Sequence, residues 1–160
     1  MAIKVSAQYK TPISVLVLIH TPDLQVLLLE RADKQGFWQS VTGSLEVLPD
    51  GSLEAHEAAA TREVMEETGL NTEDYKLEDW GCSNVYEIYL HWRHRYEPGV
   101  TQNTEHVFGL ELPASLDVQL CPQEHVRYEW VDWREAAKRV FSWTNVEALR
   151  KLGERHGQVL

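Results

Sequence analysis

Residues 54–70 read EAHEAAATREVMEETGL, and the elements around this stretch are best understood from it. Alanine is the best helix former, and four alanines early in the stretch support a predicted helix over about 52–68. Gly69 should end this helix, because glycine readily adopts the left-handed conformation of a helix C-cap. Leu70 is the apolar residue that commonly follows such a cap.

Three carboxylates, Glu63, Glu66 and Glu67, fall within one sector of this helix about 100° wide, since an α-helix turns about 100° per residue. Like charges three and four residues apart repel one another, so the cluster has a cost. One interpretation is a solvated acidic face. The other is a site for a divalent cation, because Mg²⁺ prefers carboxylate oxygens and keeps positions open for water and phosphate. Ala60 and Val64 begin the apolar stripe beside it, which we expect to pack on a sheet.

Length and composition indicate one globular domain over residues 1–160. The net charge of −10 argues against a non-specific binder of nucleic acid or membrane surfaces, which needs basic surface. The apolar run at 13–19 is too short to span a membrane, and residues 1–10 lack the pattern of a secretory signal. Cys82 and Cys121 lie far apart without metal-ligand spacing, so we expect two reduced cysteines in a cytoplasmic protein.

The remaining pattern alternates strands with helices. Pro12–His20 is predicted to be a buried strand, and a turn at 21–23 should join it to a second strand over Leu24–Arg31. Further extended segments are predicted at 37–42, 85–96, 105–112 and 128–131. Capping-box patterns at Asp132/Glu135 and Thr144/Glu147 should open helices over about 133–140 and 145–155. This order predicts an α+β fold with a mixed sheet between helices.

The pattern Glu54-x7-Arg62-Glu63-Val64-x-Glu66-Glu67-x-Gly69-Leu70 resembles the Nudix box, G-x5-E-x7-R-E-U-x-E-E-x-G-U, where U is aliphatic. Gly43 is the natural opening glycine, although ten residues separate it from Glu54 where the box has five. We interpret the surplus as an insertion around 47–51 that lengthens a loop and leaves the acidic face intact. The resemblance implies a Nudix-type α/β/α sandwich with a mixed central sheet.

The resemblance also implies a reaction and a set of roles. Nudix enzymes cleave a pyrophosphate bond in a nucleoside diphosphate linked to another group, using Mg²⁺ or Mn²⁺. By position, Glu63 and Glu67 would be the principal metal ligands, with Glu66 and the backbone carbonyl of Thr42 as further ligands. Arg62 would orient these carboxylates, supported by Glu54. The general base is left between Glu66 and Glu124, and Glu124 is also a candidate metal ligand.

Three further stretches, at 37–44, 93–105 and 142–145, resemble one subfamily, the dihydroneopterin triphosphate pyrophosphatases, whose members are also described as dATP pyrophosphohydrolases. The implied reaction converts dihydroneopterin triphosphate into its monophosphate and pyrophosphate. The alternatives are a (deoxy)nucleoside triphosphate pyrophosphohydrolase acting on a substrate such as dATP, and a non-catalytic nucleotide-binding sensor domain. The retained acidic face argues against the sensor, which has no need to keep its charge repulsion.

Candidate substrate contacts follow from this interpretation. Lys10 and Arg31 are predicted to bind phosphates, as is Thr42 beside them, and the basic segment 91–95 is expected to form a basic strand surface or a phosphate contact. Tyr86 and Tyr89 are predicted to stack on a planar ring, whose polar edge Ser142 or Asn145 would bond. The expected partner is a small-molecule triphosphate, with neither nucleic acid nor membrane. The sequence leaves the oligomeric state open.

Overall fold

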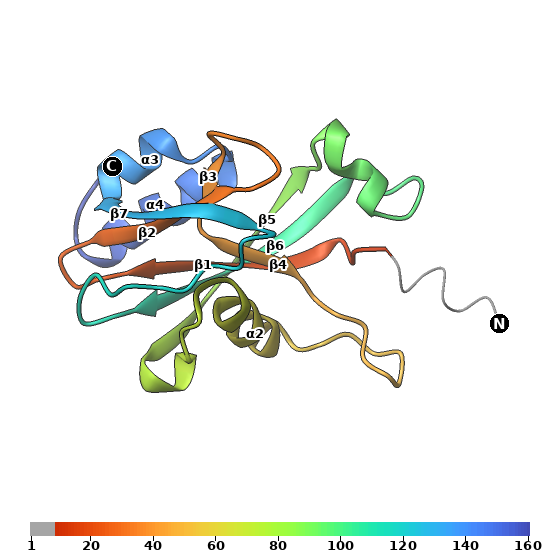
Figure 1. The fold of residues 1–160 in the computed structure, drawn as a ribbon, viewed down its shortest axis with the longest axis horizontal. Coiled ribbons are helices and arrows are strands. Elements are labelled where there is room, and N and C mark those ends of the chain that lie inside the picture. The colour runs from red at the N-terminus through yellow and green to blue at the C-terminus, as the bar shows by residue number, and fades with distance from the viewer. Residues whose placement is uncertain (1–8) are drawn as a thin grey trace.

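The computed structural model describes residues 9–160. Most of the N-terminal stretch considered for a secretory signal, residues 1–8, therefore lies outside the described residues. A mixed seven-stranded sheet forms the middle layer, with helix α2 on one face and helices α3 and α4 on the other (Figure 1). The predicted α+β sandwich is confirmed. Within residues 9–160, no helix has the length and apolar character needed to cross a membrane.

Along the chain the elements are β1 (Ile13–His20), β2 (Gln25–Arg31), β3 (Trp38–Gln39), β4 (Val41–Ser44), α2 (His56–Thr68), η1 (Thr72–Asp74), β5 (Lys76–Glu87), η2 (Leu90–Arg95), β6 (Gln102–Glu111), β7 (His125–Asp132), α3 (Trp133–Arg139) and α4 (Trp143–Arg155).

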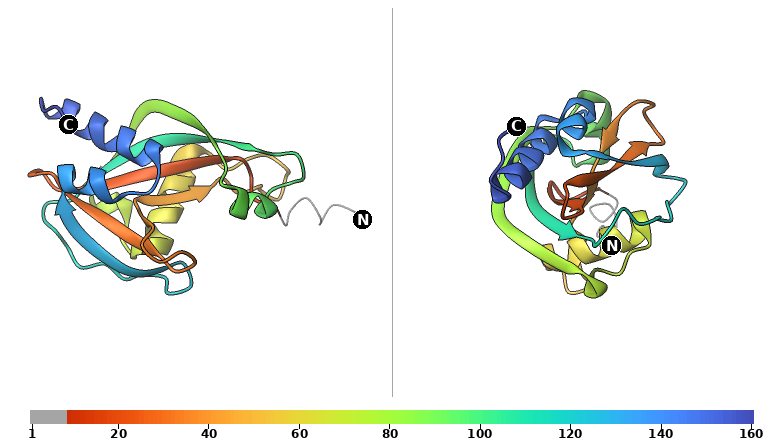
Figure 2. Two further views of the ribbon diagram at one scale, coloured as in Figure 1. Left: turned by 90° about the horizontal axis from the view of Figure 1, so that it is seen from above. Right: turned by 90° about the vertical axis from the view of Figure 1, so that its left-hand side faces the viewer.

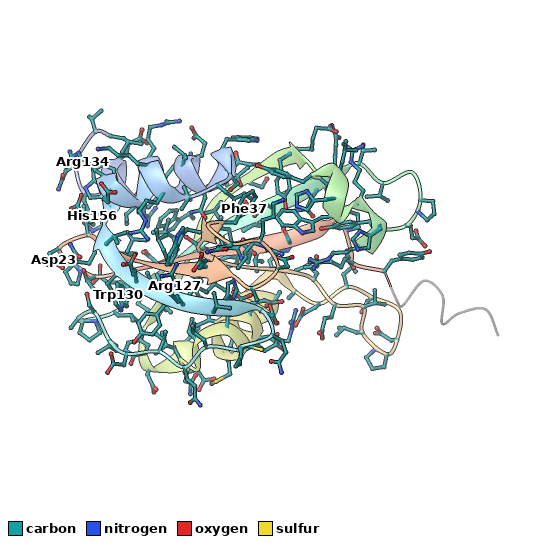
Figure 3. All side chains as sticks on the ribbon, turned by 45° about the horizontal axis from the view of Figure 1, so that its top comes forward. Asp23, Phe37, Arg127, Trp130, Arg134 and His156 are labelled. Atoms are coloured by element: carbon teal, nitrogen blue, oxygen red, sulfur yellow. The ribbon has the colours of Figure 1, made fainter. Side chains whose placement is uncertain are left out.

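Strand β1 organises the sheet, whose main order is β3-β2-β1-β6-β5. On one edge β1 pairs in parallel with β6 along its whole length, from Ile13 opposite Thr104 to His20 opposite Glu111. Its other edge is divided: residues 14–17 pair with β4, and only His20 pairs with β2. β2 in turn pairs with β7, and Arg127 of β7 (labelled in Figure 3) donates to Glu30 of β2 at 2.7 Å. The sheet therefore forks along β1.

Both faces of the sheet are buried. Val15, Val17 and Ile19 pack in the core under α2, whereas Leu16 and Leu18 pack in the core under α3 and α4. This explains why β1 has a continuous apolar sequence, since alternate residues of a strand face opposite sides. The right-hand view of Figure 2 shows the strands curving between α4 and α2.

The prediction for the helix was correct at its end and wrong at its start. Gly69 has φ of 75° and donates its N–H to the Met65 carbonyl, as predicted for the C-cap. The helix begins at His56, four residues later than predicted, because the preceding residues pair with the chain before them. Val47 bridges to Leu53, and the Glu54 N–H donates to the Glu46 carbonyl at 2.8 Å. The insertion is thus a small exposed hairpin.

Two further predictions need correction. The predicted strand over 85–96 is wrong beyond Glu87: β5 spans 76–87, and the basic segment forms the 3₁₀ helix η2 near the start of β1 (Figure 1). The Arg93 Nε donates to the Ile88 carbonyl at 2.9 Å, which bends the chain out of the sheet. Helix α4 begins at Trp143 with Ser142 as its N-cap, because the Ser142 hydroxyl accepts from the Asn145 N–H, so the predicted Thr144 cap is wrong.

Candidate active site

The acidic face of α2 lies against the backbone of β4. A Cβ atom built on Gly43 would lie 1.9 Å from Oε2 of Glu63, so only glycine leaves room for this carboxylate. Glu63 and Glu67 are buried, whereas Glu66 is exposed. The contact supports Gly43 as the glycine that opens the box, and it explains why that position is a glycine in physical terms.

Arg62 is the cation that connects these acids. Its guanidinium makes two bonds to Glu54, at 2.8 and 2.9 Å, and a third to Glu63 at 3.0 Å. It also contacts Glu66 at 3.3 Å and the Ser44 carbonyl on β4 at 3.1 Å. The bond from Arg62 holds the pKa of Glu54 below its ordinary value. Helix, preceding loop and β4 are thus joined around one guanidinium, which is the arrangement required by its predicted orienting role.

Glu67 is fully buried, and neither of its carboxylate oxygens has a hydrogen-bond partner among the described residues. Burial raises its pKa well above the ordinary value, and the nearby charge of Glu63 raises it further. A buried carboxylate without donors is expensive unless a cation pairs with it, so Glu67 and Glu63 fit a divalent ion. Within residues 9–160, no three His, Cys, Asp or Glu side chains form a ready-made metal cluster.

A line of side chains connects Glu67 to Arg31 across the fork of the sheet. Arg31 donates to Oε1 of Gln39 at 3.2 Å, and Nε2 of Gln39 lies 3.0 Å from Nε2 of His125. Nδ1 of His125 lies 3.9 Å from Oε1 of Glu67. Burial lowers the pKa of His125 to about 4, so the imidazole is neutral at pH 7. With Gln39 donating to Nε2, the His125 proton is on Nδ1 and faces Glu67.

Three cations gather beside this line. Asp33 holds two of them: it accepts two bonds from Arg31 at 2.8 Å each and one from Arg95 of η2 at 3.4 Å. The Arg31 bonds lower the pKa of Asp33 to about 2. Lys10 lies beside them, because its backbone N–H donates to the Arg95 carbonyl at 2.9 Å. Three like charges in one place suit an anion such as phosphate.

A cavity of about 450 Å³ opens on the α4 side of the sheet, between β5, η2 and the start of α4. Its volume is typical of a small-molecule site. Tyr89 packs edge-on to Phe141 and to Phe37, which is labelled in Figure 3. Aromatic side chains form much of the wall, and the cavity's lining contains Tyr86, Tyr89, Trp92, Tyr96, Phe141 and Trp143.

Two more polar cavities share lining residues with this aromatic cavity. The first, of about 470 Å³, lies over the acidic face and is lined by Glu63 and Glu66. The second, of about 240 Å³, contains Glu67. Lys10 and Thr42 line all three cavities, so the acids, the cations and the aromatic wall lie around the same two residues, and we call the three cavities together the cleft. The neighbouring aromatic, cationic and acidic surfaces suit a planar ring joined to a chain of phosphates.

The other predicted residues also border this cleft. Glu124 lies where the two polar cavities meet, and its side chain is exposed. Ser142 and Asn145 line the aromatic cavity, but their polar atoms already bond within the protein. Asn145 is buried, accepts from the Ser40 N–H at 2.9 Å and donates to the Ser40 hydroxyl at 3.0 Å. The Asn145 side chain therefore links α4 to the segment before β4, and both of its polar atoms bond to Ser40.

The cleft includes residues that sequence reasoning did not single out, among them Gln39, His125 and Glu105, while Arg95 was considered only within the basic segment 91–95. Arg95 belongs to the basic segment that was expected to be a strand. Because the segment forms a 3₁₀ helix instead, the predicted strand could not indicate which of its basic residues reaches the site. Gln39 and His125 meet only because β3 and β7 both pair with β2. Glu105 carried one available signal, an acid at the first position of a predicted strand, 105–112, that is otherwise largely apolar.

Comparisons with known proteins agree with this geometry. Residues 10–152 match the model of the NUDIX domain. The chain is 43% identical over 146 residues to dihydroneopterin triphosphate diphosphatase of Escherichia coli, covering 89% of this chain and 93% of that protein. The protein of the same name from Haemophilus influenzae is 37% identical, covering 90% and 89%. The solved structure of the E. coli pyrophosphohydrolase superposes with a TM-score of 0.81 at 42% identity, covering 89% and 95% of the two chains.

Proposed function

Because this chain belongs to the Nudix family of hydrolases, we propose that it is a Mg²⁺-dependent pyrophosphohydrolase whose substrate is dihydroneopterin triphosphate. Water and the triphosphate would give dihydroneopterin monophosphate and pyrophosphate. The observation that carries the proposal is the single cleft in which an aromatic cavity, three cations and the acidic face of α2 follow one another. The names of the E. coli and H. influenzae relatives support the choice of substrate.

Within the cleft, each surface takes one part of the substrate. Tyr86 and Tyr89 present flat apolar surface to the pterin ring. Lys10, Arg31 and Arg95 bind phosphate oxygens through charge-assisted bonds, and Thr42 borders the same path. Asp33 fixes the two arginines in place before the substrate arrives, which reduces the ordering cost of binding.

Mg²⁺, or Mn²⁺ in its place, would be held by Glu63 and Glu67, with Glu66, Glu124 and the Thr42 carbonyl as further oxygen ligands. A bound divalent cation supplies positive charge that stabilises the charge developing on the phosphate oxygens. Arg62 keeps Glu63 in position through the 3.0 Å bond, and Glu54 holds Arg62 in turn. The buried acids therefore stay oriented in spite of their mutual repulsion.

Glu66 and Glu124 are our two candidates for the general base that accepts the proton of the attacking water. Both are exposed to the cleft, and both line the cavity over the acidic face. Single Glu66→Gln and Glu124→Gln variants distinguish them, because loss of the general base removes the acidic limb of the kcat pH profile. If a variant keeps the acidic limb, the glutamate that it lacks is not the general base and serves instead as a metal ligand or a substrate contact.

The proposal is tested by assaying the full chain with Mg²⁺ on dihydroneopterin triphosphate and dATP side by side. We expect pyrophosphate as the product of both and a higher kcat/KM for the pterin. A clear preference for dATP would favour the nucleoside triphosphate alternative. Tight binding without turnover would favour the sensor alternative, and release of single phosphates would exclude both hydrolase assignments.

We also propose a cytoplasmic location and small-molecule triphosphates as the protein's partners. Both cysteines, Cys82 and Cys121, are unpaired thiols, as expected in a reducing compartment. The net charge of −10 disfavours nucleic acid as a partner.

A further inference from the structure

Glu105 is a buried acid at the aromatic cavity for which the proposed reaction gives no role. It lies on β6, borders the cavity, and is only 4% exposed. Its Oε1 has no hydrogen-bond partner among the described residues. The Thr144 side chain bonds to this carboxylate, so Oε1 is the oxygen that still needs a donor, and the cavity that Glu105 borders is a direction from which donors can reach it.

Glu105 belongs to a row of polar side chains across the sheet. In the strand pairing, Ser44 of β4 lies opposite Ser14 of β1, Ser14 beside Glu105, and Glu105 opposite Asn84 of β5. The Ser44 hydroxyl and the Asn84 Nδ2 are also buried without a partner among the described residues. Buried polar groups are normally bonded in folded proteins, and among these adjacent exceptions Glu105 is the one that borders the aromatic cavity, so it indicates a site for a polar ligand there.

The chemistry of a carboxylate restricts which ring it can bind. Its two oxygens accept hydrogen bonds side by side, so they match an edge with two neighbouring N–H donors. The 2-amino-4-oxopyrimidine ring, which pterins and guanine share, has such an edge in its amino group and adjacent ring N–H. Adenine presents an amino group beside an unprotonated ring nitrogen, which is an acceptor and repels a carboxylate.

We propose that Glu105 selects the substrate's ring by accepting two hydrogen bonds from the donor–donor edge of a 2-amino-4-oxopyrimidine. This inference rests on the proposed function, which it deepens by assigning the cavity to one class of ring. The aromatic walls bind any flat ring, because stacking is tolerant of ring chemistry. Glu105 supplies the discrimination, since a site built to bond polar groups strongly rejects a ring that leaves them unpaired.

The test compares wild type, Glu105→Gln and the control Glu111→Gln on dihydroneopterin triphosphate, dGTP and dATP. Glu111 is an exposed acid of the same strand and lies outside the cavity. Glu111→Gln is therefore the control that removes one negative charge from β6 without changing the cavity. An amide offers one donor and one acceptor, which suits the adenine edge. For Glu105→Gln we expect kcat/KM to fall roughly a hundredfold for the pterin and for dGTP and to change less than about threefold for dATP. An equal loss on all three substrates, or no loss on any, would overturn the proposal.

A second measurement needs no variant and no phosphate. Binding of neopterin, guanosine and adenosine to the metal-free wild-type chain, followed by calorimetry, should give at least a tenfold weaker affinity for adenosine than for the other two. Equal affinities would overturn the role of Glu105. If the chain proves not to hydrolyse dihydroneopterin triphosphate, the proposed function fails, while this comparison and the dGTP/dATP pair still decide the ring preference.

Discussion

Among individual residues, Glu67 combines the largest burial cost with the most direct expected role. Its carboxylate is fully buried, lacks hydrogen-bond donors among the described residues and lies close to Glu63. Such a group weakens the fold when no cation is bound, because both burial and repulsion penalise its charge. A role in binding a ligand therefore explains a glutamate at this buried position better than a contribution to folding stability does.

Glu67→Gln should lower pyrophosphate release by roughly a hundredfold or more at saturating Mg²⁺, the scale for losing a major electrostatic contributor. Its free energy of unfolding without metal should be unchanged or higher, since a buried charge is removed. Glu57→Gln, an exposed acid of the same helix, is the matched control. Wild-type turnover by the Glu67 variant would refute the assigned role.

Glu105 should make stability depend on pH in a defined direction. Burial raises its pKa to about 7, from an ordinary value of 4.5, so the folded state binds this proton more tightly than the unfolded chain does. The stabilisation is complete below pH 4.5 and is lost as the pH rises through 7, a total of about 3 kcal/mol. The facing titratable groups, Tyr86 and Tyr96, stay neutral over this range because burial raises the pKa of each.

The measurement is urea unfolding of wild type and Glu105→Gln between pH 4.5 and 8. The variant should gain stability over wild type across this range, because glutamine has no charge to bury. Titrations elsewhere in the chain cancel in the difference between the two proteins. A difference that stays constant with pH would show that this carboxyl titrates normally.

At the scale of elements, patterns governed by local backbone preferences were predictable. The box helix ends at Gly69 as expected, and β1 was recognisable because a strand covered on both faces is apolar throughout. The predictions were wrong where contacts with another segment of the chain determine the local structure. Residues 52–55 fit a helix by composition, but residues 52, 53 and 54 pair with residues 48, 47 and 46.

The candidate site divides in the same way. The acids of α2 share one face through helical periodicity, so spacing alone brings Glu63 and Glu67 together. The Gln39–His125 contact depends on three strands pairing in register, which no short-range pattern encodes. Arg95 was missed as an individual residue because η2 replaces the expected strand and turns one cation of the basic segment toward Asp33.

Deleting residues 47–51 should leave the fold intact. Glu46 and Glu54 are already paired across the hairpin, and Ser52 with Leu53 would join them as a two-residue loop. Val47 and Leu48, the large apolar residues that the deletion removes, are 54% and 39% exposed, so little apolar burial is lost. We expect an unfolding free energy within about 1 kcal/mol of wild type, as loop length costs little. Loss of the folded state in circular dichroism would show that the hairpin packs structurally.

At the scale of the whole molecule, the local charge in part of the cleft is opposite in sign to the net charge of the chain. The chain carries a net charge of −10, yet Lys10, Arg31 and Arg95 converge at one point of the cleft. The acids of α2 lie on the other side of that point, so the cleft has both signs of charge within reach of one triphosphate. Binding of a cation should therefore stabilise the entire domain.

Mg²⁺ at about one hundred times its dissociation constant should stabilise the fold by about 2.7 kcal/mol, which corresponds to a rise in Tm of roughly 5–10 °C for a domain of this size. Differential scanning calorimetry of the substrate-free chain measures it. Glu67→Gln should lose most of the shift, while Glu57→Gln should keep it. An equal shift in both variants would indicate that the ion binds elsewhere.

The parallel pairing of β1 with β6 has a consequence for synthesis of the chain. Ile13 meets Thr104, so the central strand leaves the ribosome long before its partner does. Until residue 111 has emerged, β1 has an open edge and apolar side chains on both faces, which is the combination that promotes aggregation. Closing so long a loop also makes this pairing a late event in folding. Among the strands made before β6, β1 pairs with β4 over residues 14–17 and with β2 at His20, so its other edge stays open during synthesis although the finished protein buries it.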